Sequence, residues 1–365
     1  MRPSFGSFTA LLAIALGSGV PLAPAGLGSQ EPARTRTASA WSVAGDPFAD
    51  LWFHSLAVIG YEGYGPLSMY DSRYAARVHD AKVRGHVTTT LDRRAAELRT
   101  VLAADSAFEV LHFLPLYFVG QAPSVVLSAL RAAIVDGSRA SSTTSLMPAA
   151  SVIAAALPTR QERAAFTSLL DAVDDEWTTF MRADRSSRLA EDRRIMRELQ
   201  SAWDDRYAGA LGGYLSAIDV RRGSILISPA IGTEGRIVRD RSGAVIVVVS
   251  PVGAVGGENA ALLRVVRELA FPLLDQLRTP LVPPTTRVTA ARARDAAAVR
   301  AGAIILDAVD QPLAAEYRKV FLDATRGRGF ENAFPLSNEA DIELRRLVTS
   351  ANRGAVSGRT SYENY

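Results

Sequence analysis

The chain has no cysteine in any of its 365 residues, and this absence limits how it can be held together. Disulfide frameworks, thiolate metal sites and cysteine nucleophiles are all excluded. Stability must therefore come from packed apolar side chains. Hydrophobic residues make up 48% of the chain, which is long enough to build one large or two modest cores.

The N-terminus has the three parts of a secretory signal. Arg2 is a positive start, an apolar stretch runs from about Phe8 to Leu22, and small residues suited to cleavage follow at 23–25. We therefore expect residues 1–25 to be a signal peptide, and the protein to be exported to a periplasm or outside the cell. An uncleaved anchor is the alternative, although a membrane span needs roughly 20 apolar residues. After cleavage we expect no stable membrane span.

Positive and negative side chains are interleaved along the chain, as in Asp92-Arg93-Arg94. The net charge is only +3, and Lys82 and Lys319 are the only lysines. A nucleic-acid surface would show a patch of one sign with stacking aromatic residues, and no such stretch is present. We therefore expect no nucleic-acid partner.

We predict a single globular unit at 46–350, between a flexible leader at 26–45 and a flexible tail at 351–365. Its first part, 46–215, is predicted to be helical because apolar residues recur at helical spacing. The helices expected there include 88–104, 123–134, 160–182 and 189–218. His112 lies in the apolar run 108–118, which is predicted to be core.

The pattern changes near Arg221, and the second part, 216–350, is predicted to hold a small sheet. Strands are expected at 224–228 and 244–249, with a turn at 232–235 between them. A glycine-rich loop at 253–257 then leads into a helix at 258–277. Further helices are expected at 286–308, 313–324 and 339–349. The predicted fold class is α+β, predominantly helical, with a small sheet packed against helix 258–277.

Helix 258–277 has two distinct faces at about 100° per residue. The apolar stripe consists of Leu262, Val265, Val266, Leu269 and Leu273. The opposite face consists of Arg264, Arg267, Glu268, Phe271 and Asp275. On an ordinary surface helix these residues would form an Arg264–Glu268 pair and a contact of Arg267 with the ring of Phe271.

The string Arg267-Glu268-Leu269-Ala270-Phe271 resembles the His-Glu-x-x-His helix of gluzincin-type zinc metallopeptidases. Arg267 stands in the place of the first histidine and Phe271 in that of the second. Glu268 stands where the general base of that family would stand. The resemblance implies a zincin-like fold, with Arg264, Arg267 and Phe271 facing a cleft that could bind a peptide. Pro272 departs from the pattern, because proline kinks or ends a helix.

The residues required for a catalytic zinc ion are missing. Arginine stays protonated and repels a dication, and phenylalanine has no lone pair to donate. The histidines lie upstream, at His54, His79, His86 and His112, and none are spaced as i and i+4. We therefore expect no metal and no cofactor.

The favoured hypothesis is an exported, zincin-like protein that has lost peptidase activity and acts by binding a peptide or a protein partner. The first alternative is an active hydrolase with a non-standard site, in which Glu268 works with Asp295 or Glu316. The second alternative is a structural or interaction protein of the cell envelope without peptidase ancestry, whose helix 258–277 is an ordinary amphipathic helix.

Overall fold

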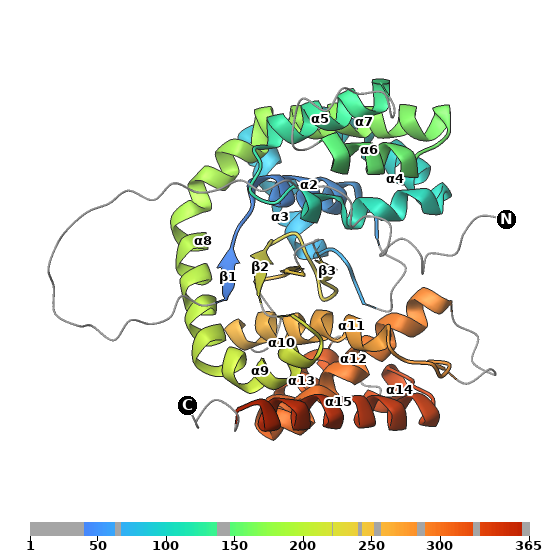
Figure 1. The fold of residues 1–365 in the computed structure, drawn as a ribbon. Coiled ribbons are helices and arrows are strands. Elements are labelled where there is room, and N and C mark those ends of the chain that lie inside the picture. The colour runs from blue at the N-terminus through green and yellow to red at the C-terminus, as the bar shows by residue number, and fades with distance from the viewer. Residues whose placement is uncertain are drawn as a thin grey trace, which may run out of the picture.

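The structure is predominantly helical, and a four-stranded sheet lies between two layers of helices (Figure 1). It is a computed structural model that describes residues 40–62, 67–136, 147–220, 222–239, 243–251, 257–282, 289–323 and 329–359. The predicted signal peptide at 1–25, the leader as far as residue 39, and residues 252–256 of the glycine-rich loop lie outside the described residues.

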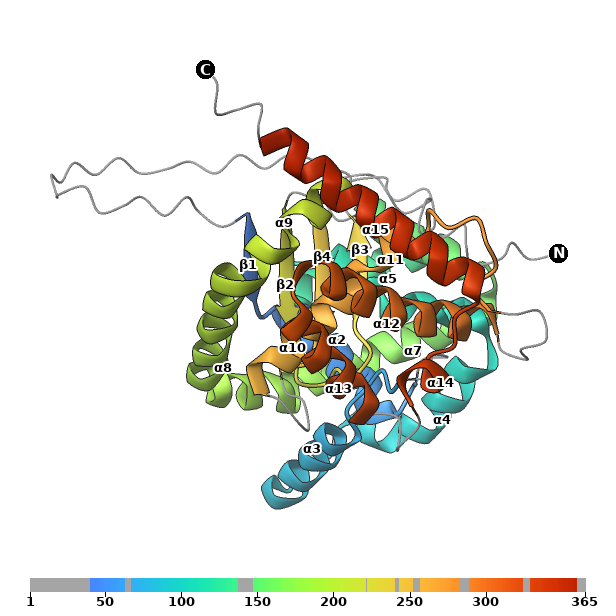
Figure 2. The ribbon, with the colours of Figure 1, turned by 90° about the horizontal axis from the view of Figure 1, so that it is seen from below.

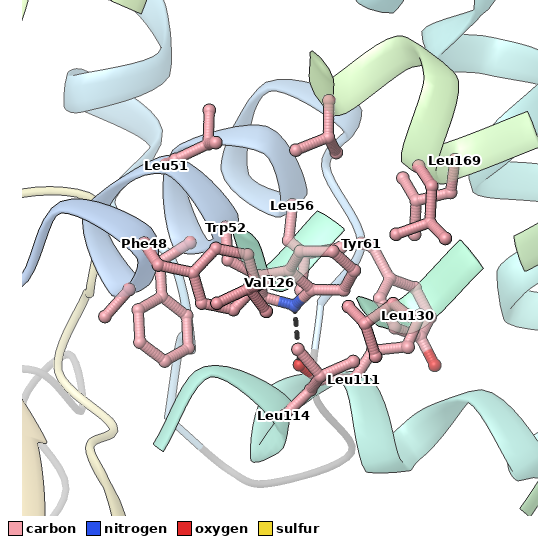
Figure 3. Close-up of a cluster of buried hydrophobic side chains, with 14 of the residues drawn as sticks. Phe48, Leu51, Trp52, Leu56, Tyr61, Leu111, Leu114, Val126, Leu130 and Leu169 are labelled. Atoms are coloured by element: carbon pink, nitrogen blue, oxygen red, sulfur yellow. Dashed lines mark hydrogen bonds between the residues drawn. The ribbon is translucent and has the colours of Figure 1, made fainter. Parts of the chain in front are cut away.

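The first layer, here called the N-terminal layer, precedes most of the sheet in the sequence. It consists of α2 (Pro47–Ile59), α3 (Ser72–Gly85), α4 (Thr90–Ala104), the 3-10 helices η2 (Ser106–His112) and η3 (Leu114–Tyr117), α5 (Pro123–Asp136), α6 (Met147–Ala156) and α7 (Arg160–Glu176). Helix α2 is buried along nearly its whole length, and Trp52 donates a 2.8 Å hydrogen bond from Nε1 to the carbonyl of Leu111 within its apolar core (Figure 3). His112 is 2% exposed, so the prediction that the run 108–118 is core is confirmed.

The sheet consists of β1 (Trp41–Ala44), β2 (Gly223–Ile227), β3 (Arg236–Arg239) and β4 (Val245–Val249) in the order β1-β2-β4-β3. β1, β2 and β4 are parallel, and β3 is antiparallel to β4. Successive side chains alternate between the two faces. Leu226 and Val248 pack into the core of the N-terminal layer, whereas Ile225 and Val247 pack into the opposite core. The two cores are therefore separated by one sheet.

A continuous helical run links the two layers along one side of the molecule (Figure 1). After α7 come a π-helical turn η5 (Trp177–Met181), α8 (Arg182–Ala202), a second π-helical turn η6 (Trp203–Tyr207) and α9 (Ala208–Ala217). The prediction of two separate helices, 160–182 and 189–218, is therefore wrong about the break. No proline or glycine lies between the two predicted helices, so the chain continues as helix.

The second layer, here called the C-terminal layer, covers the other face of the sheet. Besides α9 it consists of α10 (Gly257–Leu269), α11 (Phe271–Leu274), α12 (Ala290–Val309), α13 (Gln311–Asp323), α14 (Phe330–Ala333) and α15 (Asn338–Arg359). Helix α10 packs against β4, which confirms the expected contact of sheet and helix. Figure 2 shows α15 lying across this layer, next to α9 and α12.

Three predicted boundaries need correction. Residues 41–44 of the predicted leader form β1, because they pair in parallel with β2 and Trp41 packs against Trp203 at 4.9 Å between ring centroids. The predicted helix 258–277 ends at Leu269 and restarts as α11, since Pro272 lacks a backbone N–H. The predicted tail is helical as far as Arg359, because α15 continues without interruption.

Candidate functional site

The charged face of α10 is buried, contrary to the expectation that it looks into an open cleft. Arg267 is 0% exposed, Glu268 is 1% exposed and Arg264 is 4% exposed. The face opposite the apolar stripe is covered because α10 also contacts α12, α13 and β3. Phe271, at the start of α11, is half-buried. Three of the four predicted site residues are therefore inside the protein.

Arg267 is held between two carboxylates. Its guanidinium forms an ion pair through Nη1 with Glu268 and a second through Nη2 with Asp295, at 3.0 Å. The guanidinium carbon also lies 5.1 Å from the ring centroid of Phe271, as expected for a cation–π contact. Burial alone would lower the pKa of Arg267, but Glu268 and Asp295 outweigh it and the pKa is raised. A permanent cation therefore lies where the sequence resemblance would put a metal ligand.

Glu268 connects α10 to the edge of the sheet. Its Oε1 accepts a 3.2 Å hydrogen bond from the backbone N–H of Gly235, which directly precedes β3. A Cβ at residue 235 would lie 2.6 Å from the carbonyl oxygen of Val248 and 3.0 Å from the Cγ of Glu268, so this close approach needs glycine. Burial raises the pKa of Glu268, although the charges of Arg267 and Arg236 oppose the shift.

Glu234 and Arg236 complete the site and were not among the predicted site residues. They form an ion pair, and Arg236 also lies 5.3 Å from the ring centroid of Phe113 in the N-terminal layer. Glu234 is 1% exposed, and its Oε2 has no hydrogen-bond partner among the residues that the structure describes. The sequence signal was a pair of charged residues, Glu234 and Arg236, on either side of Gly235 at the predicted turn 232–235.

Other predicted partners lie elsewhere. The expected Arg264–Glu268 pair does not form, because Glu268 pairs with Arg267 instead. Burial lowers the pKa of Arg264 to about 10, with Asp71 opposing. Asp275 pairs with Arg294, while Glu316 lies 3.4 Å from Arg206. Of the two acids named for the hydrolase alternative, only Asp295 contacts the α10 site directly.

Tyr317, on α13, lies next to Arg267 and Glu268. Its hydroxyl is buried without a hydrogen-bond partner among the described residues. A Cβ at Gly302 of α12 would lie 2.6 Å from Cζ of Tyr317, so glycine makes room for the ring. Burial raises the pKa of Tyr317, and the charge of Arg267 opposes the shift. Tyr317 is therefore a neutral side chain next to the ion pairs.

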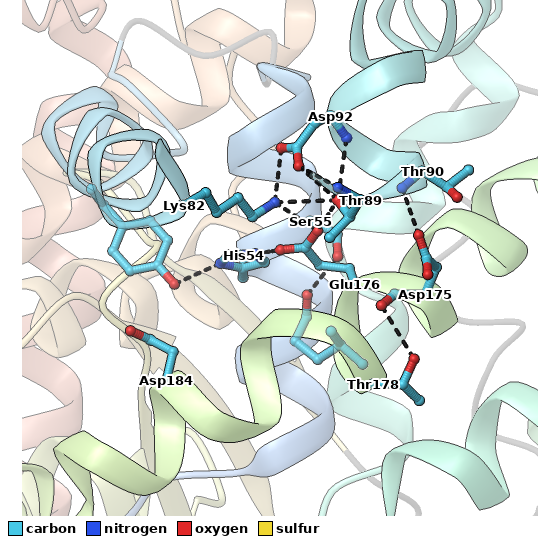
Figure 4. Close-up of polar contacts among 12 residues, drawn as sticks. His54, Ser55, Lys82, Thr89, Thr90, Asp92, Asp175, Glu176, Thr178 and Asp184 are labelled. Atoms are coloured by element: carbon cyan, nitrogen blue, oxygen red, sulfur yellow. Dashed lines mark hydrogen bonds and ion pairs between the residues drawn. The ribbon is translucent and has the colours of Figure 1, made fainter. Parts of the chain in front are cut away.

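A second buried polar cluster lies in the N-terminal layer, around Glu176 (Figure 4). Oε1 of Glu176 lies 2.7 Å from Nε2 of His54, and Oε2 lies 2.8 Å from Nζ of Lys82 and accepts a 2.6 Å hydrogen bond from Thr89. The other ring nitrogen of His54 lies 2.8 Å from the hydroxyl of Tyr74. Both oxygens of the buried carboxylate are thus engaged within the protein.

In the part of the chain that the structure describes, no group of three or more His, Asp and Glu side chains could hold a metal ion. Two of the histidines are engaged elsewhere, His54 with Glu176 and His112 with Tyr70 at 2.8 Å. Within the same residues, no helix combines the length and apolarity that crossing a membrane requires.

Comparisons of the chain with protein-family models, curated proteins and solved structures give no match.

Proposed function

We propose that this chain is an exported, zincin-like protein without peptidase activity, which binds an extended segment of a peptide or partner protein along the edge strand β3. The carrying observation is the hydrogen bond from Gly235 to Glu268, because it joins the edge strand β3 to the buried charges of α10. Export is supported by the signal-like pattern of residues 1–25.

The outer side of β3 presents backbone groups that have no hydrogen-bond partner among the described residues. Val245 donates its N–H to the carbonyl of Arg222, beside β2, so by alternation Val248 faces β3 and pairs with Arg236. The backbone N–H and C=O of Ile237 then point away from the sheet. Such an edge accepts an extended peptide as an added strand, with main-chain hydrogen bonds providing affinity.

Loss of hydrolysis is supported by the chemistry at Arg267. Its guanidinium is paired with Glu268 and Asp295, and a fixed cation between these carboxylates disfavours a dication there. Glu268, the residue matched to the general base of the zinc peptidases, accepts hydrogen bonds from Arg267 and Gly235. It is buried, so a hydrolytic water would need to displace these contacts.

The zincin-like part of the proposal is supported by the order of elements. An antiparallel edge strand, a central parallel strand and then the α10 helix follow one another, and α10 packs against that central strand. The later helix α12 brings Asp295 to the same point as Arg267.

The test combines metal analysis, hydrolysis and binding. Purified protein should contain no stoichiometric zinc and should cleave no member of a broad peptide library, with or without added divalent metals. Peptides selected from a displayed library should bind wild-type protein and lose affinity on Ile237→Pro, which removes the outward N–H without breaking a ladder bond. Ile237→Val is the matched control that keeps the N–H.

Zinc binding together with hydrolysis that disappears in Glu268→Gln would overturn the proposed loss of activity. Equal binding by the Pro and Val variants at residue 237 would overturn the proposed use of the β3 edge.

A further inference from the structure

The α10 site holds more negative than positive charge. Four carboxyl groups, those of Glu109, Glu234, Glu268 and Asp295, interact electrostatically with only two guanidinium groups, those of Arg236 and Arg267. Among the described residues no further basic side chain forms an ion pair with any of the four. With every group ionised the site would carry two uncompensated negative charges.

Two of these carboxylates can accept further hydrogen bonds. Oε2 of Glu234 is buried and has no hydrogen-bond partner among the described residues, and the residue is 1% exposed. The half-buried side chain of Glu109 has no hydrogen bond or ion pair within the described part of the chain. A buried acceptor without a donor destabilises the folded protein, so a ligand that supplies a donor there is favoured.

Part of the excess negative charge lies next to β3. Glu234 directly precedes Gly235 and β3, and Glu109 comes from η2 in the N-terminal layer, so the two acids lie on different elements. Solvent reaches this place at Asp295 and Arg236, whose side chains are 15% and 11% exposed. A segment added along β3 would therefore extend beside acids from both layers.

We propose that the segment bound along β3 carries an organic cation, an ammonium or guanidinium group, which is held by Glu109, Glu234 and Asp295. This inference rests on the proposed function and names the chemistry of its ligand. A donor-rich cation satisfies the unpartnered oxygen of Glu234 and offsets the excess negative charge. A metal dication fits less well, because the two fixed guanidinium groups repel it. The cation can come from a lysine or arginine side chain or from a free amino terminus.

Five-residue strand peptides of alternating threonine and valine test the inference, with binding measured by fluorescence anisotropy. Three versions are acetylated and amidated and differ only at the central residue, which is lysine, norleucine or glutamate. A fourth has norleucine at the centre and a free amino terminus. We expect the lysine peptide to bind at least about tenfold more tightly than the norleucine peptide, and the glutamate peptide to bind most weakly. Added salt should reduce these differences in affinity between the peptides. If the fourth peptide binds more tightly than the lysine peptide, the bound cation is the free amino terminus.

Glu109→Gln should reduce the preference for lysine several-fold, since it removes a half-exposed charge without breaking a hydrogen bond or ion pair among the described residues. Glu97→Gln, which alters an exposed acid paired with Arg94 on α4, is the matched control and should leave the preference unchanged. If all peptides bind alike and Ile237→Pro weakens them all, the cation inference is wrong and strand addition stands. If none binds, the proposed function fails together with the inference.

Discussion

Glu176 and Glu268 are both buried glutamates at the centre of polar clusters, yet their environments differ. The oxygens of Glu176 are engaged by His54, Lys82 and Thr89. Glu268 shares one arginine with Asp295 and interacts electrostatically with Glu234, whose Oε2 has no hydrogen-bond partner among the described residues. Burial would raise the pKa of either residue, but at Glu176 the contacts of His54 and Lys82 outweigh burial and lower the pKa.

This difference separates a structural cluster from a candidate site. A fully satisfied polar network rigidifies a core, whereas unsatisfied buried groups and raised carboxyl pKa values concentrate at sites that act on a ligand. The cluster around Glu176 therefore stabilises the N-terminal layer, and the cluster around Glu268 is the better candidate for function. The four predictions that follow test this comparison.

The largest effect is expected for Lys82→Met. The substitution leaves the carboxylate of Glu176 buried without its cation, so the free energy of unfolding should fall by about 3–5 kcal/mol, measured by urea unfolding. Lys319→Met changes the only other lysine, which is exposed on α13, and should alter stability by less than about 0.5 kcal/mol. Similar losses in the two variants would show that the Glu176 cluster contributes little.

Gly302→Ala should have the next largest effect, because the new methyl group would meet the ring of Tyr317 at 2.6 Å from Cζ. Overpacking of this kind costs about 1–3 kcal/mol, measured as a lower midpoint of thermal unfolding. Gly212→Ala in α9 meets nothing within 4 Å and should instead stabilise the helix by about 0.5–1 kcal/mol. An unchanged midpoint for Gly302→Ala would mean that Tyr317 is not tightly packed.

The pH dependence of stability should differ in sign between Glu176→Gln and Glu268→Gln. Glu176, whose pKa is lowered, contributes stability above the ordinary pKa of 4.5 that is lost as the pH falls through the folded value. Glu268, whose pKa is raised, contributes stability below 4.5 that is lost as the pH rises through the folded value.

Relative to wild type, Glu176→Gln should therefore be most destabilised near pH 7, and Glu268→Gln near pH 4. Urea unfolding between pH 4 and pH 8 measures both profiles. Profiles of the same sign would contradict the contrast between the two glutamates.

The smallest effect on stability is expected for Glu109→Gln, within about 0.5 kcal/mol, because the half-buried side chain makes no hydrogen bond or ion pair with the described residues. Thermal unfolding measures this. A large loss of stability would give Glu109 a structural role and would argue against assigning it to ligand binding.

Much of the local structure could be predicted from sequence periodicity. The strand predictions at 224–228 and 244–249 match β2 and β4 to within one residue at each end, and helix 123–134 matches α5 to within two. β1 could not be predicted, because Trp41–Ala44 has no strand-like length of its own and is ordered by pairing with β2. β3 is also short, and its charged ends, Arg236 and Arg239, are not typical of a strand, so its pairing with β4 could not be predicted.

The candidate site was only partly predictable. The helical wheel correctly grouped Arg267, Glu268 and Phe271, and the contact of Arg267 with Phe271 is confirmed. The wheel carries no information about what covers a face, so it predicted exposure where α12, α13 and β3 produce burial. Glu234 and Arg236 flank Gly235, which is 33 residues from Glu268 in the sequence, and only the pairing of β3 with β4 brings them to α10.

The sequence by itself determined that no disulfide or thiolate site exists, that most of the chain is helical, and that arginine and phenylalanine, which are not metal ligands, stand at positions 267 and 271. These properties depend on residue identity and on local periodicity. Tertiary structure alone decided that the charged face of α10 is buried, that Asp295 pairs with Arg267, and that one oxygen of Glu234 has no partner among the residues that the structure describes. The reason is physical: burial and ion pairing depend on which elements pack together, and here two helical layers and an edge strand meet at one point.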